Sequence, residues 1–175
     1  MRAILPLIGF LILILTFAIG LTRDPGFLPS EMLDRPMPNF QLSDLYHSDE
    51  VLTSEMFLGE IALINVFGSW CVACTVEHPK LMSLSKSKTI KIVGINWRDS
   101  REAGQKWLKQ YGNPYAQIIF DSDSRLAIDL GVTGAPESFI VDKAGRIRYK
   151  HVGIITDSVW KDILHPIIMD LEAQT

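Results

Sequence analysis

The two cysteines of the chain are separated by only two residues, Val72 and Ala73. A disulfide between Cys71 and Cys74 would close a very small ring, which constrains the unfolded chain by only about 2 kcal/mol in the loop-entropy model. A structural cross-link usually joins distant segments, so that role is the less favoured alternative. The spacing predicts a reactive pair that exchanges disulfides with other molecules.

The position of the pair indicates which cysteine attacks first. The apolar run Ile61–Phe67 is typical of a strand buried on both faces, and residues from Cys71 to about Leu84 are expected to form a helix after it. A cysteine at a helix start lies beside unpaired backbone N–H groups, which lower its pKa. We therefore expect Cys71 to be an exposed nucleophile and Cys74, one turn further on, to be the resolving thiol.

Two other uses of this cysteine spacing depend on the residues that follow it. Attachment of c-type haem requires histidine directly after the second cysteine, where Thr75 stands. A metal site could combine both cysteines with His78, but no second cysteine pair or histidine cluster completes a tetrahedron. We expect no metal and no cofactor besides a Cys71–Cys74 disulfide, and we interpret His78 as a polar residue flanking the site.

The remaining elements are predicted by alternating apolar runs, helical stretches and turns. Strands are expected at 61–67, 90–97, 116–120, 138–141 and 146–152, and helices at 71–84, 124–130, 157–171 and from a cap at Asp99 or Ser100 to Tyr111. Inside the first helix, Pro79 should produce a kink. A hairpin at 142–145 closes the pattern, which predicts an α/β fold with a central mixed sheet flanked by helices. Binding sites of such sheets lie beyond the carboxyl ends of strands, where residues 68–74 fall.

The N-terminal residues 1–21 are predicted to form a transmembrane anchor. Residues 3–21 contain no charged side chain, and about 20 residues suffice to cross a bilayer. A cleaved signal peptide is the alternative, with Ala18-Ile19-Gly20 as its cleavage site. Four of the nine prolines fall in residues 22–38, so we expect an extended linker there and one domain at 39–175.

Compartment and partners follow from composition. Disulfide chemistry suits an oxidising compartment, so the domain is expected in the periplasm, with a single pass through the inner membrane. The net charge of -3, with basic and acidic residues interspersed, provides no basic surface for phosphates. Nucleic acid is therefore not expected as a partner.

Three features together resemble the thioredoxin-like superfamily. Residues 70–74 match its Trp-Cys-x-x-Cys motif, Pro79 lies five residues after the second cysteine, and Pro136 lies at the start of a later strand. The resemblance implies a thioredoxin-like fold in which the peptide bond before Pro136 is cis and faces the cysteines. Ala135 and Pro136 are then expected to line the groove that binds the partner chain. Trp70 is expected to be a partly exposed wall of this groove, because aromatic residues are enriched at interfaces, with a core position as the alternative.

A closer resemblance is to the thiol:disulfide interchange proteins of cytochrome c maturation, the DsbE/CcmG family. Residues 131–137 are similar to its Gly-Val-x-Gly-Ala-Pro-Glu signature and residues 74–78 to its Cys-x-x-Glu-His, within a match over roughly residues 39–160. The resemblance implies a protein-disulfide reductase that acts on the haem-attachment motif of apocytochrome c or with the haem-ligation machinery. A membrane thiol reductase would then supply its electrons.

The chain departs from these families at several positions. Val72-Ala73 stand where members often carry Pro-Thr, and Thr133 stands where an aromatic residue is common. Thioredoxins proper usually hold a buried aspartate where this chain has Asn65. Another group must therefore accept the proton of Cys74.

Two acids are candidates for this proton transfer. Glu77 lies one helical turn after Cys74, and Glu137 follows Pro136 directly. A partly desolvated carboxylate near a thiol can take its proton. We therefore predict catalytic roles for Glu77 and Glu137 beside the two cysteines.

Three other functions remain as alternatives. A thiol peroxidase on this fold would need Thr or Ser three residues before Cys71, where Gly68 stands. A copper or zinc carrier for oxidase assembly would use the thiolates as ligands. A general periplasmic disulfide reductase would use the same chemistry on assorted proteins.

Overall fold

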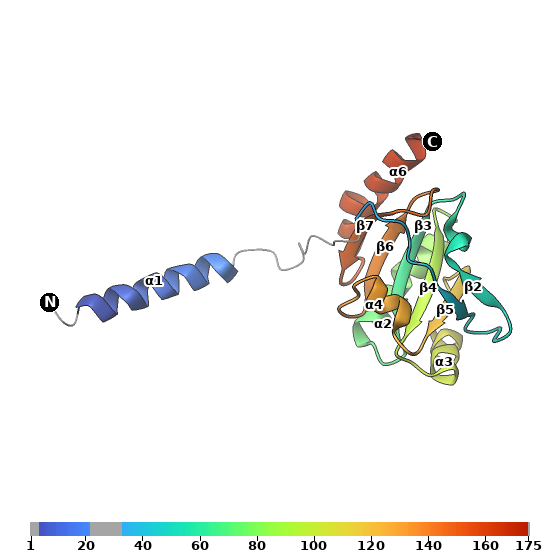
Figure 1. The fold of residues 1–175 in the computed structure, drawn as a ribbon, viewed down its shortest axis with the longest axis horizontal. Coiled ribbons are helices and arrows are strands. Elements are labelled where there is room, and N and C mark those ends of the chain that lie inside the picture. The colour runs from blue at the N-terminus through green and yellow to red at the C-terminus, as the bar shows by residue number, and fades with distance from the viewer. Residues whose placement is uncertain (1–3, 22–32, 175) are drawn as a thin grey trace.

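The computed structural model describes residues 4–21 and 33–174 (Figure 1). Helix α1 (Ile4–Leu21) lies in the segment predicted as an anchor. Across the described residues, no helix combines the length and hydropathy that a membrane crossing requires. The anchor stays a prediction, and residues 22–32 of the expected linker lie outside the described part of the chain.

A five-stranded mixed sheet forms the centre of the domain, in the order β5-β4-β3-β6-β7. Strand β3 pairs in parallel with β4 and antiparallel with β6, and all six of its residues are buried. The expected central strand and mixed sheet are therefore confirmed. The strands are β3 (Ala62–Phe67), β4 (Lys91–Trp97), β5 (Gln117–Asp121), β6 (Glu137–Val141) and β7 (Ile147–Val152).

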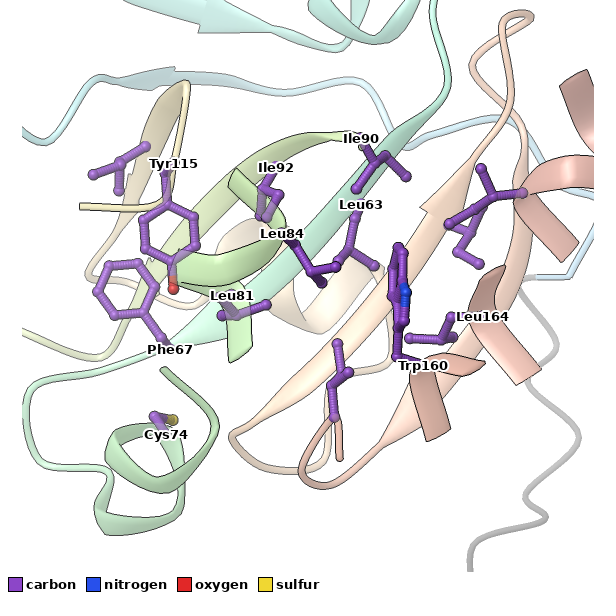
Figure 2. Close-up of a cluster of buried hydrophobic side chains, with 14 of the residues drawn as sticks. Leu63, Phe67, Cys74, Leu81, Leu84, Ile90, Ile92, Tyr115, Trp160 and Leu164 are labelled. Atoms are coloured by element: carbon purple, nitrogen blue, oxygen red, sulfur yellow. The ribbon is translucent and has the colours of Figure 1, made fainter. Parts of the chain in front are cut away.

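Helices cover both faces of the sheet because alternate residues of β3 face opposite sides. Leu63 and Phe67 join a cluster with side chains of α2, α3 and the C-terminal helices (Figure 2), whereas Ile64 and Val66 face a cluster with η1 and α4. The helices are η1 (Ser54–Phe57), α2 (Val72–Lys86), α3 (Arg101–Tyr111), α4 (Arg125–Asp129), α5 (Asp157–Val159), η2 (Trp160–Leu164) and α6 (His165–Ala173). Helix α2 continues past Pro79, and Ser100 caps α3.

The residues before β3 form structure that the sequence pattern did not predict. Strands β1 (Gln41–Ser43) and β2 (Val51–Thr53) make a short antiparallel hairpin, and the Leu45 N–H donates to the Ile118 carbonyl on β5. At the other side of the sheet, the backbone of residues 34–37 hydrogen-bonds with that of Gly145 and Ile147. Residues 34–37 fall in the expected linker, yet their backbone is paired with the sheet; the domain boundary at residue 39 stays a prediction.

Candidate functional site

Cys71 and Cys74 form a disulfide at the start of α2. Cys71 is the N-cap residue of this helix, and its Sγ accepts a hydrogen bond of 3.1 Å from the Cys74 N–H. In the reduced protein, the same N–H would stabilise a Cys71 thiolate, as the sequence predicted. Cys71 is only 4% exposed in this oxidised form, because it packs in the hydrophobic cluster around α2, so its expected exposure is wrong here.

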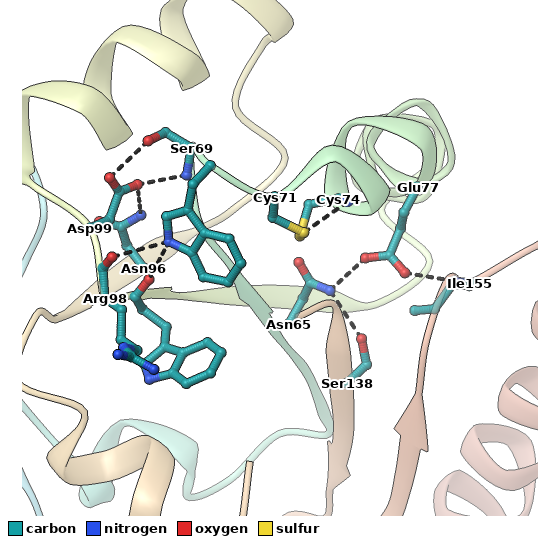
Figure 3. Close-up of a disulfide and its surroundings, with 12 residues drawn as sticks. Asn65, Ser69, Cys71, Cys74, Glu77, Asn96, Arg98, Asp99, Ser138 and Ile155 are labelled. Atoms are coloured by element: carbon teal, nitrogen blue, oxygen red, sulfur yellow. Dashed lines mark hydrogen bonds between the residues drawn. A yellow bond between two sulfur atoms is a disulfide. The ribbon is translucent and has the colours of Figure 1, made fainter. Parts of the chain in front are cut away.

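The loop before the cysteines is held by Asp99, two residues after the end of β4. The Asp99 carboxylate accepts hydrogen bonds from the Ser69 N–H at 2.7 Å and the Ser69 hydroxyl at 2.8 Å. The Asn96 amide also donates to it at 3.0 Å (Figure 3). Sequence reasoning considered Asp99 only as a helix cap, so this role was missed.

Trp70 lies beside the disulfide with half of its surface exposed, as expected for a groove wall. Its indole N–H is shared between the carbonyl oxygens of Trp97, at 3.2 Å, and Arg98, at 3.0 Å. A Cβ at Gly68 would lie 2.5 Å from the indole nitrogen, so the absence of a side chain there lets the ring lie close to the loop backbone. The exposed indole gives a partner chain an apolar surface next to the sulfurs.

The Glu77 carboxyl group is buried in a network of hydrogen bonds on the same side of α2 as Cys74 (Figure 3). Oε1 accepts from the Asn65 amide at 2.7 Å, and Oε2 accepts from the Ile155 N–H at 2.6 Å. Burial raises the pKa of Glu77 from 4.5 to about 7, although both hydrogen bonds oppose this rise. A carboxyl group with this pKa can accept and return a proton near neutral pH, which is the role predicted for Glu77.

Pro136 lies at the same edge of the sheet as the cysteine loop. The peptide bond between Ala135 and Pro136 is cis, as the resemblance implied. Val66 pairs with Glu137 across β3 and β6, so Pro136 lies beside the end of β3, from which the cysteine loop departs. The Pro136 carbonyl accepts from the Gly153 N–H at 2.9 Å.

Glu137 is fully buried and binds the loop that precedes it. Its Oε1 accepts from the Thr133 N–H at 2.8 Å, the Thr133 hydroxyl and the Gly134 N–H at 3.0 Å. Its Oε2 lies 2.9 Å from the Lys150 ammonium group. These contacts indicate that Glu137 positions the proline loop; its predicted role in proton transfer stays a prediction.

His78 is not a polar flank, contrary to the prediction. It is 2% exposed, its ring packs edge-on against Trp107, and Nε2 donates to the Gly112 carbonyl over 3.0 Å. Burial lowers its pKa, so the ring is neutral and serves as a core residue between α2 and the end of α3. No group of three or more metal-ligating side chains occurs among residues 4–21 and 33–174.

The buried disulfide at a helix start, the carboxyl group behind it and the cis-proline loop at one sheet edge define a thioredoxin-like thiol:disulfide oxidoreductase. Comparison with known proteins agrees, since residues 32–164 match the Redoxin family model. The chain is 41% identical to the thiol:disulfide interchange protein DsbE of Allochromatium vinosum, over 95% of this chain and 92% of that protein. It is 39% identical to DsbE of Escherichia coli, over 94% and 91% of the two chains.

Two solved structures share the fold. A putative DsbE from Chlorobium tepidum has a TM-score of 0.65 and 23% identity, covering 78% of this chain and 95% of its own. A secreted thiol-disulfide isomerase from Corynebacterium glutamicum has a TM-score of 0.68 and 22% identity, covering 84% and 96%. These two structures show the fold alone. The relatives above show that the chain belongs to the DsbE family of thiol:disulfide interchange proteins.

Proposed function

We propose that the protein reduces the disulfide in the haem-attachment motif of apocytochrome c, with its domain in the periplasm and residues 1–21 anchored in the inner membrane. Family membership and the apolar N-terminal segment support this proposal. The observation that carries the chemistry is the buried Glu77 carboxyl group beside a disulfide whose first cysteine caps a helix. A membrane thiol reductase would return the dithiol to its reduced form.

The reaction transfers two electrons from the protein to its client. The Cys71 thiolate attacks one client sulfur, which breaks the client disulfide, forms a mixed disulfide and releases a client thiolate. Cys74 then passes its proton to the Glu77 carboxylate and attacks the Cys71 sulfur, which breaks the mixed disulfide and releases the second client thiolate. The products are the reduced client and the Cys71–Cys74 disulfide seen in the structure.

Cys74→Ser in the full chain provides the test, because it strands the mixed disulfide on Cys71. We expect apocytochrome c to be trapped on this variant in cells that make c-type cytochromes. The matched control is Cys71→Ser, which lacks the attacking sulfur and should trap no client by this route. Recovery of many unrelated proteins without apocytochrome c would show a general disulfide reductase instead.

A further inference from the structure

Tyr115 is a buried tyrosine that the disulfide exchange mechanism does not use directly. Its ring stacks on Phe67 with 4.8 Å between centroids (Figure 2), and its hydroxyl donates to Asn65 Oδ1 over 2.8 Å. Burial, together with the charge of Glu77, raises the pKa of Tyr115 well above its usual range. The phenol therefore keeps its proton and acts as a permanent hydrogen-bond donor to Asn65.

The Asn65 amide group has two possible orientations, which exchange its oxygen and nitrogen. In the orientation found, Nδ2 donates to Glu77 Oε1 at 2.7 Å and to Ser138 Oγ at 3.1 Å (Figure 3). In the opposite orientation, the amide oxygen would face the Glu77 oxygen. Two acceptors at that distance repel each other when Glu77 is ionised, but they share a proton when Glu77 is protonated.

The phenol hydroxyl decides between these orientations. In the described part of the chain, the acceptor of its hydrogen is Asn65 Oδ1. Turning the amide would present an N–H group to the phenol and leave the hydroxyl hydrogen unpaired in the core, which folded proteins avoid. We propose that Tyr115 is a positioning residue that holds the Asn65 amide as a hydrogen-bond donor to Glu77 and so keeps the Glu77 carboxylate available.

The other groups around Glu77 do not fix the orientation of the Asn65 amide. The loop between β7 and α5 contributes the neutral Ile155 N–H, and β6 contributes Ser138 through Asn65. On α2 itself, Cys74 is in the disulfide and Lys80 is paired with Asp157 at 2.6 Å. His78, which follows Glu77 in the sequence, donates its hydrogen to the Gly112 carbonyl and not to Glu77. Only the last step of the inference, the use of the carboxylate by Cys74, rests on the proposed function.

The test is the titration of the Glu77 carboxyl carbon by 13C NMR in the full, oxidised protein, with Glu77→Gln used to assign its signal. In Tyr115→Phe, the turned amide becomes available whenever Glu77 is protonated. We expect the midpoint to rise by about one pH unit, a tenfold change in the ionisation constant. If reduction of the client depends on the carboxylate, its rate at pH 7 should fall about fivefold and recover at pH 9.

Two further variants separate positioning from a general effect on the core. Tyr111→Phe is the matched control, since Tyr111 is exposed on α3, and it should leave the midpoint unchanged. In an Asn65→Ala background, Tyr115→Phe should produce little further shift, because the amide through which it acts is gone. An equal shift with and without Asn65 would overturn the proposal.

Ser138→Ala tests the same assignment if Tyr115→Phe does not fold. It removes the second acceptor of the Asn65 amide but leaves the Tyr115 hydroxyl on Asn65 Oδ1, so the amide should keep its orientation and the Glu77 midpoint should stay nearly unchanged. A rise of about one pH unit in Ser138→Ala would show that Ser138 holds the amide and would contradict the proposal. The titration needs no client, so it tests the positioning role apart from the proposed function. If the Glu77 midpoint shifts as expected but the protein does not reduce apocytochrome c, the positioning role stands and only the proposed function is refuted.

Discussion

The ammonium group of Lys150 lies 2.9 Å from Oε2 of the buried Glu137. The same ammonium group donates to the Gly131 carbonyl over 2.6 Å, so one side chain on β7 holds both ends of the loop that leads to Pro136. Glu137 in turn holds the Thr133 and Gly134 N–H groups. The shape of the expected client groove therefore depends on a residue that does not touch the cysteines.

Lys150→Met should destabilise the protein by leaving the Glu137 charge buried and unpaired. We expect the free energy of unfolding, measured by urea denaturation, to fall by about 3 kcal/mol. Lys161→Met, at an exposed site on η2, is the control and should change the free energy of unfolding by less than about 0.5 kcal/mol. Adding Glu137→Gln to Lys150→Met should recover part of the loss; no recovery would show that the charge is not the cause.

The raised pKa of Glu77 predicts how stability changes with pH. Its pKa is about 7 in the folded protein against an ordinary value of 4.5, so between these values the folded protein keeps a proton that the unfolded chain has lost. The contribution of this group is therefore most favourable below pH 4.5, is lost as the pH rises to 7, and amounts to roughly 3 kcal/mol.

Urea denaturation of the oxidised protein at pH 5 and pH 8 measures this change. Glu77→Gln cannot titrate, so its stability should fall less between these pH values than that of the natural protein. Parallel pH profiles for the two proteins would contradict the assignment of the raised pKa to Glu77.

Gly68→Ala should displace the Trp70 indole. The new Cβ would lie 2.5 Å from the indole nitrogen and 2.7 Å from Cε2, so the ring must move and its hydrogen bonds to Trp97 and Arg98 weaken. We expect a loss of about 1 kcal/mol in stability and a red shift in tryptophan fluorescence. Gly134→Ala, where a Cβ meets nothing within 4 Å, should leave the fluorescence unchanged.

Asp99→Ala should loosen the loop that carries the cysteines. It removes the acceptor of the Ser69 N–H and of the Asn96 amide, and the loss of such partners costs about 1–3 kcal/mol. Hydrogen exchange at the Ser69 amide should become faster by at least about tenfold, corresponding to 1.4 kcal/mol in local stability. Asp162→Ala, at an exposed site, is the control. Equal rates of hydrogen exchange at the Ser69 amide in the two variants would show that Asp99 does not hold this loop.

The fold was largely predictable because its two central strands, β3 and β4, are largely apolar and buried runs. Ile61–Phe67 was expected and Ala62–Phe67 is found; residues 90–97 were expected and Lys91–Trp97 is found. The hairpin of β1 and β2 was missed because each strand has only three residues, too few for a period to show. The prolines of residues 22–38 predict a linker, and this pattern conceals a segment at residues 34–37 that pairs with the edge of the sheet.

The site was predictable only where its residues are close in sequence. Cys71, Cys74 and Glu77 lie within two turns of one helix, so their spacing places them together. Tyr115 and Ile155 reach the same network from 50 residues beyond Asn65 and 78 residues beyond Glu77, respectively. Such pairs depend on the order of the strands in the sheet, which a local sequence pattern does not reveal. The burial of His78 was not predicted for the same reason, because its contacts, Trp107 and Gly112, are distant in sequence.

The segments that pair with the two edges of the sheet affect whether another polypeptide can add a strand to it. Along the described chain, residues 34–37 pair with residues 145–147 at the start of β7, and Asp44 and Leu45 pair with Ile118 and Ile119 of β5. An extended polypeptide can add itself to an open sheet border, and this is a common start of aggregation. Where these segments pair with the sheet, another extended chain cannot add a strand, which limits this route to aggregation at both places.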